Sequence, residues 1–246
     1  MKKLFLMAGL VMFLWTAGFA QTDYMQFEVI YIKPKEGQSE MVKKGLADHN
    51  KKFHAKDPYR VSVGSIITGP NSGDFVWVMG PTTWTQLDNA PGEGDHSADW
   101  NKNISPYCES EGETMYWRSV KDVSYQAPGS DSFKKTRMRV EYVYPDQMDR
   151  FTGQMKKVAE VFEQKKYEAS FSMATRVGLT QGPNAVTFVD FAKYAFWDSD
   201  SKFSKDYEDV FGQGSFARFL AELDLCIDRS KTYDELSETL PEASTR

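Results

Sequence analysis

Short runs of β-branched and aromatic residues alternate along this chain with longer stretches in which apolar residues recur every three or four positions. Residues 27–32 form the first such run and stop at Pro34, which predicts a strand. Residues 38–56 then have the spacing of an amphipathic helix, with one apolar face made of Val42, Leu46, His49 and Phe53. The pattern closes with a strand pair at 61–68 and 75–79, a helical region that includes Trp100, Ile104 and Tyr107, and a strand at 115–123.

The second half of the chain repeats this order of segments. Gly69-Pro70-Asn71 recurs as Gly182-Pro183-Asn184, and the flanking positions keep one register over about 55 residues. In that register Glu28 matches Glu141, Tyr31 matches Tyr144, and Trp84 matches Trp197. The second copy is predicted to contain a strand at 138–144, a helix at 147–166, a strand pair at 171–180 and 185–191, a helical region at 203–223 and a closing strand at 225–233.

Each copy therefore has the order strand, helix, strand, strand, helix, strand, which is the ferredoxin-like βαββαβ arrangement. The fold class is α+β, with two such repeats in tandem, packed sheet to sheet. A stretch rich in Pro, Gly and Ser separates them and predicts a surface connection. The boundaries we expect are 1–20 for a signal peptide, 21–125 for the first repeat, 126–135 for the linker, 136–240 for the second repeat and 241–246 for a tail.

Two ferredoxin-like units with a long first helix, a Gly-Pro hairpin and an aromatic second helix resemble the dimeric α+β barrel superfamily. That group includes NIPSNAP, antibiotic biosynthesis monooxygenase, EthD and stress-responsive A/B barrel proteins, and the resemblance covers nearly all of residues 24–235. It implies a barrel with ligand cavities between the sheet and the helices of each half. Because one chain supplies both halves, the resemblance also implies a monomeric pseudo-dimer.

The first twenty residues predict export. A basic start at Lys2 and Lys3 is followed by an apolar run, and Gly18 and Ala20 occupy the positions that a signal peptidase reads. We expect cleavage after Ala20 and a soluble mature protein in the periplasm or outside the cell, with no membrane insertion. No later segment is long and apolar enough to cross a bilayer.

The charge balance argues against nucleic acid as a partner. The formal net charge is −5, and loss of the two signal-peptide lysines makes it about −7. The chain has only two cysteines, Cys108 and Cys226. In an oxidising compartment they either pair as a disulfide or stay apart as small core residues, and the sequence leaves both alternatives open.

His49 is the candidate catalytic residue, because an imidazole on the apolar face of a helix can act as acid or base or orient a ligand. Its partner in the second repeat is Phe162, so we expect a working cavity in the first half and a more filled second half. The candidate ligand-binding residues of that first half are His49, Tyr31, Trp77, Trp84, Trp100 and Arg118. The alternative for each of them is ordinary packing in the core or solvation at the surface.

We expect no metal and no cofactor. His49 and His54 are five residues apart, which places them about 140° apart around a helix and excludes a shared ion. Asp95, His96 and Asp99 offer potential ligands in one loop but lack partners from elsewhere in the chain, and the acidic segment 198–206 departs from a calcium loop at its ligand and glycine positions.

Three functions remain open. The first is binding of a small apolar or aromatic molecule in a cavity of the first repeat. The second is a small-molecule enzyme similar to cofactor-independent monooxygenases, with His49 and nearby aromatic groups activating the substrate. The third is a structural or partner-binding protein whose cavities are filled by side chains. With these three functions open, the sequence does not decide whether the protein is an enzyme.

Overall fold

The computed structural model describes residues 24–178, 182–199 and 202–246. The predicted signal peptide lies outside these residues. The first half contains β1 (Gln26–Pro34), α1 (Ser39–Phe53), β2 (Val61–Ile66), β3 (Phe75–Thr82), α2 (Trp84–Leu87), α3 (Asp95–Asn103), β4 (Cys108–Glu111) and β5 (Met115–Tyr125). The second half contains β6 (Lys135–Glu141), α4 (Met148–Lys165), β7 (Ala169–Arg176), β8 (Ala185–Phe191), α5 (Lys202–Phe211), α6 (Ser215–Cys226) and β9 (Tyr233–Thr239).

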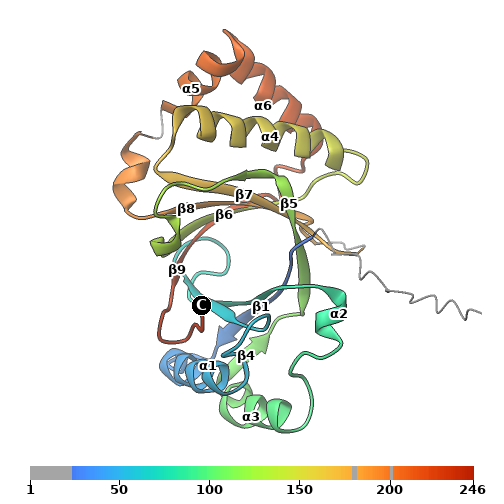
Figure 1. The fold of residues 1–246 in the computed structure, drawn as a ribbon, viewed down its shortest axis with the longest axis vertical. Helices are drawn as coiled ribbons and strands as arrows, with labels where there is room; N and C mark the ends of the chain where they lie inside the picture. The colour runs from blue at the N-terminus through green and yellow to red at the C-terminus, as the bar shows by residue number, and fades with distance from the viewer. Residues whose placement is uncertain (1–23, 179–181, 200–201) are drawn as a thin grey trace, which may run out of the picture.

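Eight strands close into one antiparallel barrel. Their order is β3-β2-β9-β6-β8-β7-β5-β1, and the pairing of β1 with β3 completes the ring, while the short β4 adds to β1 at the outer edge. Figure 1 looks along the barrel and shows α1 and α3 beneath it and α4, α5 and α6 above it. The α+β class and the dimeric α+β barrel fold predicted from the sequence are therefore confirmed.

The last strand of each half joins the two halves. β5 pairs with β1 of its own half and with β7 of the other, and β9 pairs with β6 and with β2 in the same way. The prediction that residues 225–233 form the closing strand is wrong. Residues 215–226 continue as α6, which buries Phe219 and Cys226, and the strand begins only at Tyr233. The apolar residues that favoured a strand, Leu225 to Ile227, are the last two residues of this helix and its C-cap, and of the three only Cys226 and Ile227 are buried.

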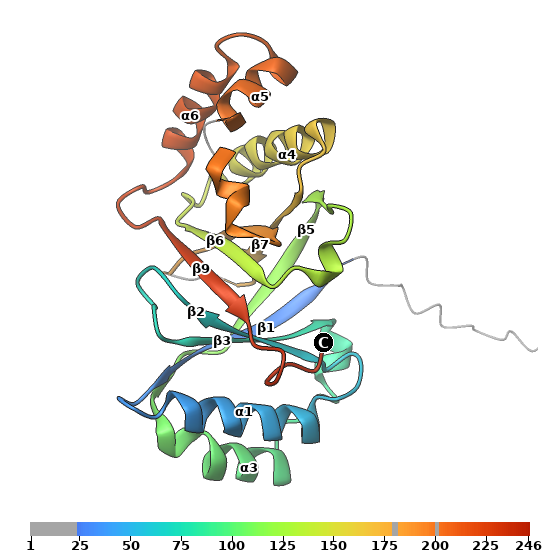
Figure 2. The ribbon, with the colours of Figure 1, turned by 90° about the vertical axis from the view of Figure 1, so that its left-hand side faces the viewer.

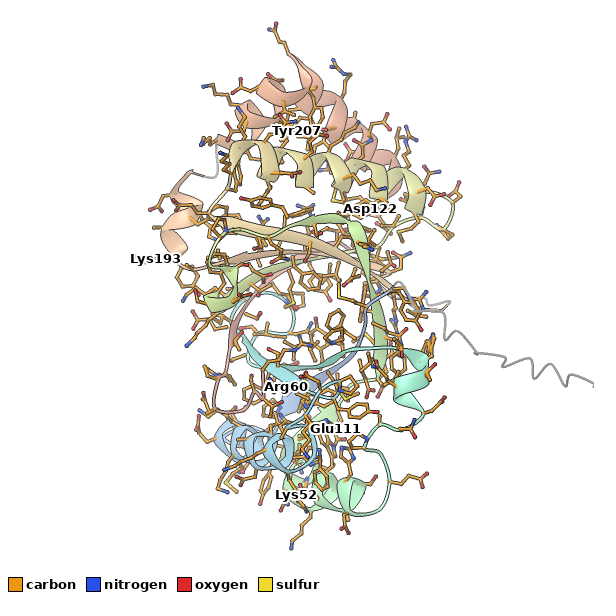
Figure 3. All side chains as sticks on the ribbon, in the orientation of Figure 1. Lys52, Arg60, Glu111, Asp122, Lys193 and Tyr207 are labelled. Atoms are coloured by element: carbon orange, nitrogen blue, oxygen red, sulfur yellow. The ribbon has the colours of Figure 1, made fainter. Side chains whose placement is uncertain are left out.

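Alternation along the strands separates two packing regions. On β3 the side chains of Val76 and Val78 face the barrel interior, whereas Trp77 and Met79 belong to the core under α1 and α3. A separate apolar cluster inside the barrel consists of Trp117, Met138, Val140, Ala174 and Val186. Figure 3 shows side chains from the surrounding strands projecting into the ring that the ribbon outlines. Each barrel strand thus contributes side chains to a helix-covered core on one face and to the barrel interior on the other.

The two cysteines do not pair. Cys108 and Cys226 are buried free thiols in different halves, and the Cys108 thiol donates to the carbonyl oxygen of Ile104 at 3.3 Å. Of the two alternatives, the structure therefore shows separate core residues. Among the described residues, no helix combines the length and the apolar character that crossing a bilayer requires.

Candidate functional site

A cavity of about 590 Å³ lies inside the barrel and is lined by strands of both halves. Its volume falls in the range of small-molecule sites. Most of its wall is apolar and comes from alternating positions of the surrounding strands, among them Val29, Val78, Met115, Trp117, Met138 and Phe188. An interior built of such positions can exclude water from a bound molecule.

Tyr31 is the predicted site residue that lines this cavity. Its hydroxyl lies 3.5 Å from Oε2 of Glu235, a fully buried carboxylate on β9. Oε1 of Glu235 accepts from the backbone amide and the side-chain amide of Asn71, at 3.2 Å and 2.7 Å. Burial raises the pKa of Glu235, and the bonds from Asn71 oppose that shift. The Gly-Pro-Asn turn found in the sequence thus supplies the partner of a carboxylate next to the barrel interior.

A second acid lines the cavity directly. Oδ1 of Asp190 accepts from the Thr136 hydroxyl at 2.6 Å, and burial raises the pKa of this carboxyl. Arg176 also lines the cavity and forms an ion pair with Glu113. A mostly apolar chamber with a few polar groups of this kind can orient a ligand through one or two hydrogen bonds.

A larger open cleft of about 1410 Å³ lies in the second half, between the helices α4 to α6 and the outer face of β6 and β8. Phe162 is among its lining residues, so the expectation of a filled second half is wrong. The outer face of β6 carries Arg137, Arg139 and Glu141, and such charged groups do not make an apolar core under the helices. Figure 2 shows α5 and α6 stacked beyond α4, away from the sheet.

His49 lies in the first half, fully buried on α1. Its Nδ1 is 2.9 Å from Oδ2 of Asp99, and its Nε2 is 3.1 Å from Nε2 of His96. His54 approaches from the other side, with its Nε2 also 3.1 Å from Nε2 of His96 and its Nδ1 3.1 Å from the Tyr59 carbonyl oxygen. The candidate ligand atoms of the three rings lie within 4.8 Å of one another.

The prediction that His49 and His54 point in different directions is wrong. Helix α1 ends at Phe53, and His54 is the residue after it, with φ −120° and ψ 29°. Helical spacing therefore does not describe the direction of its ring. His96 lies in the first turn of α3, which brings a third imidazole to the other two. Burial lowers the pKa of each ring, and together with its histidine neighbours it brings the pKa of His54 to about 3.

The other predicted ligand residues do not form one site with Tyr31. Trp77 and Trp100 lie on the helix side of the sheet: the ring of Trp77 is 5.2 Å from His54 and the ring of Trp100 is 5.2 Å from His49. Trp84 is 44% exposed and packs on Tyr116. The guanidinium of Arg118 stacks 4.0 Å above the ring of Tyr24.

Several residues of both sites were missed in the sequence. Asp190, Arg176 and Glu235 belong to the second half, where no polar ligand residue was expected. Their inward direction follows the strand alternation, but only the closed barrel brings them opposite Tyr31. Asp99 was not missed, since the sequence places it three positions after His96 and on the same side of a helix, but its contact with His49 does not follow from that spacing.

No family model and no curated protein matches the sequence. Solved structures do match. An anthrone oxidase-like protein superposes with a TM-score of 0.61 at 7% identity and covers 89% of this chain and 92% of its own. A proposed monooxygenase from Lactobacillus acidophilus gives 0.57 at 13% identity, with 87% and 94% covered. A heme-binding protein from Thermus thermophilus gives 0.52 at 10% identity, with 89% and 92% covered. At such identities these likenesses establish a shared α+β barrel fold.

Proposed function

We propose that this protein binds a small, largely apolar or aromatic molecule inside its barrel. The observation that carries the proposal is the cavity of about 590 Å³, whose wall combines apolar side chains of both halves with a few polar groups. This differs in place from the site expected between the sheet and helices of the first repeat. There Trp77, Leu46 and Ile104 are buried in one cluster and occupy the space.

The polar groups narrow the ligand class. Asp190 already accepts one hydrogen bond from Thr136, and its second oxygen can accept another from a ligand hydroxyl or amine. Tyr31 offers a hydroxyl on another strand. A molecule with an apolar or aromatic body and one polar end satisfies both features, because the remaining wall offers mainly carbon atoms.

Oxygenation of the bound molecule is the second candidate. Two proteins with a similar fold are described as an anthrone oxidase-like protein and as a proposed monooxygenase. These descriptions support oxygenation as a candidate function for this chain. Within the proposed cavity, the groups able to exchange a proton with a substrate include Tyr31 and Asp190, and Tyr233 and Glu113 also line its wall. His49 is not such a group, because its two ring nitrogens face Asp99 and His96.

Heme is a poor fit to this chain. One neighbour is described as heme-binding, and a large cleft does exist in the second half. However, the residues that line this cleft include no histidine and no cysteine. The three histidines of the chain all lie in the first half and contact one another. We therefore assign no step of the function to heme.

Two further proposals concern the whole molecule. The basic start and apolar run of residues 1–20 support export by a cleaved signal peptide to the periplasm or beyond. The closure of the barrel by a single chain supports a monomer, because each half already supplies the strands that pair with the other.

Native mass spectrometry of protein purified gently from the periplasm tests the binding function. We expect a monomer with an additional small mass that is absent from the denatured protein. Ala174→Leu places a larger side chain in the cavity wall, so it should reduce that adduct and the fluorescence gained by 1-anilinonaphthalene-8-sulfonate. Ala217→Leu on the exposed face of α6 is the control and should bind as the wild type does.

The outcomes distinguish the proposals. Equal dye binding by wild type and Ala174→Leu, with circular dichroism showing both folded, would place the ligand outside the barrel. A wild-type protein without adduct and without dye binding would favour a barrel filled by side chains. A dimer mass would contradict the monomeric state.

A further inference from the structure

Three imidazole nitrogens from three parts of the chain meet at one point in the first half. Nε2 of His96 is 3.1 Å from Nε2 of His49 and 3.1 Å from Nε2 of His54. His49 and His54 are at most 1% exposed. These are all the histidines that the chain has, and each comes from a different local environment: the body of α1, the residue after α1 and the first turn of α3.

Hydrogen bonds between the three neutral rings cannot satisfy all of their Nε2 atoms. A carboxylate and a carbonyl oxygen only accept, so Nδ1 of His49 donates to Asp99 and Nδ1 of His54 donates to Tyr59. In their neutral forms both rings then present a lone pair at Nε2. Nε2 of His96 carries one proton at most, so it can donate a hydrogen bond to only one of these two lone pairs. The other lone pair then faces the Nε2 nitrogen of His96 at 3.1 Å without a hydrogen bond.

We propose that His49, His54 and His96 bind one divalent transition-metal ion of the zinc class. A cation between the rings accepts all three lone pairs at once. Tetrahedral zinc with Zn–N bonds of about 2.0–2.1 Å needs nitrogens about 3.3 Å apart. Two of the observed separations are 3.1 Å and all candidate ligand atoms lie within 4.8 Å, so small side-chain rotations form the site.

The hydrogen-bond partners behind two of the three rings, His49 and His54, are those of a metal site. Metal-binding histidines usually donate their other N–H to a carboxylate or a backbone carbonyl, which fixes the ring. Asp99 does this for His49, and the Tyr59 carbonyl does it for His54. Asp99 is itself held by the Asn103 amide at 3.2 Å and by Lys52 Nζ at 3.6 Å. Figure 3 labels Lys52 at the outer side of the first half.

The ligand atoms and the rings around the cluster favour one class of metal ion. Neutral imidazole suits zinc, copper and nickel, whereas calcium and magnesium prefer oxygen ligands. Aromatic rings of Phe53, Trp77 and Trp100 pack around the cluster and limit its contact with water. Three protein nitrogens leave a fourth tetrahedral position for water or an outside ligand. The site is separate from the barrel cavity, because Trp77 and the cavity residues Val76 and Val78 face opposite sides of β3.

Titration of the metal-free protein tests this inference. The full mature chain is produced without a histidine tag, treated with chelator and titrated with Zn²⁺ by calorimetry, with the stoichiometry checked by elemental analysis. We expect one Zn²⁺ per chain and a rise in melting temperature when Zn²⁺ is added. With Co²⁺ as the probe, visible d–d absorption should report nitrogen coordination.

Matched variants assign the site. His96→Ala should abolish one-to-one binding, the absorption of bound Co²⁺ and the Zn²⁺-dependent stabilisation. His96 is the least buried of the three rings, so this variant disturbs the core least. Asp95→Ala, on the neighbouring exposed position, should keep all three properties. The inference is overturned if the folded wild type binds no Zn²⁺ or Co²⁺, or if His96→Ala binds either ion as tightly as the wild type.

Discussion

Nδ1 of His49 lies 2.9 Å from Oδ2 of Asp99, although fifty residues separate them in the chain. The bond connects α1 to α3 and fixes which nitrogen of His49 carries the proton, since a carboxylate only accepts. The other nitrogen is thereby directed, as a lone pair, toward His96. One contact between two helices therefore sets the tautomer with which His49 faces His96, while the Tyr59 carbonyl does the same for His54.

Replacing Asp99 tests this relationship. Asp99→Asn removes the negative charge but keeps an oxygen that can accept from His49. Loss of such an outer carboxylate typically weakens metal binding by about 10- to 100-fold, and we expect a decrease of that size in Zn²⁺ affinity by calorimetric titration. Asp95→Asn, in the same turn of α3, is the control. Unchanged affinity in Asp99→Asn would show that the carboxylate only joins the two helices.

Asn50 connects three elements through one buried side chain. Its Oδ1 accepts from Nε1 of Trp77 at 3.0 Å, and its Nδ2 donates to the carbonyl oxygen of Ala243 at 2.8 Å. Asn50→Ala leaves two buried groups without partners, so the free energy of unfolding should fall by about 2–5 kcal/mol in urea denaturation. The exposed Asn101→Ala should change it by less than about 0.5 kcal/mol. If Asn50→Ala lowered the free energy of unfolding by no more than Asn101→Ala does, water would have to replace both hydrogen bonds.

Two helical glycines should respond to alanine in opposite ways. At Gly45 on α1 a Cβ atom would overlap the carbonyl oxygen of Asn103, so Gly45→Ala should destabilise the fold by about 1–3 kcal/mol. At Gly153 on α4 nothing lies within 4 Å of the new atom, so Gly153→Ala should stabilise it by about 0.5–1 kcal/mol. Thermal unfolding of both variants measures the difference. Shifts of the same sign would contradict the close approach of α1 to the end of α3.

Asp190 should make stability depend on pH. Burial raises the pKa of its carboxyl in the folded protein. The folded state therefore holds this proton more tightly than the unfolded state, and stability is lost as pH rises above the unfolded value of about 3.9. Asp190→Asn keeps the acceptor for Thr136 without the charge, so it should melt at a higher temperature than the wild type at pH 7.

The advantage of Asp190→Asn should shrink as pH falls and disappear below about 3, where the wild-type carboxyl is protonated in both states. Melting curves at several pH values, compared with those of the exposed Asp131→Asn variant, measure this. A difference between Asp190→Asn and wild type that is independent of pH would mean that the buried charge is not its cause.

The sequence alone determined the local elements and their duplication. The predicted helices at 38–56 and 147–166 correspond to α1 and α4, and the first predicted strand corresponds to β1. These predictions succeeded because apolar periodicity and turn residues act between near neighbours. The strand predicted at 225–233 was wrong, because a short apolar run such as Leu225 to Ile227 has the same composition in a strand and at the end of a helix.

Tertiary structure alone decided where the sites lie. Closure of the barrel through β5–β7 and β9–β2 pairing places Tyr31 and Asp190, from different halves, on one cavity. The end of α1 at Phe53 frees His54 from helical spacing, and the packing of α3 on α1 brings His96 to it. Neither result follows from spacing along the chain, because both depend on which segments, distant in sequence, pack against each other.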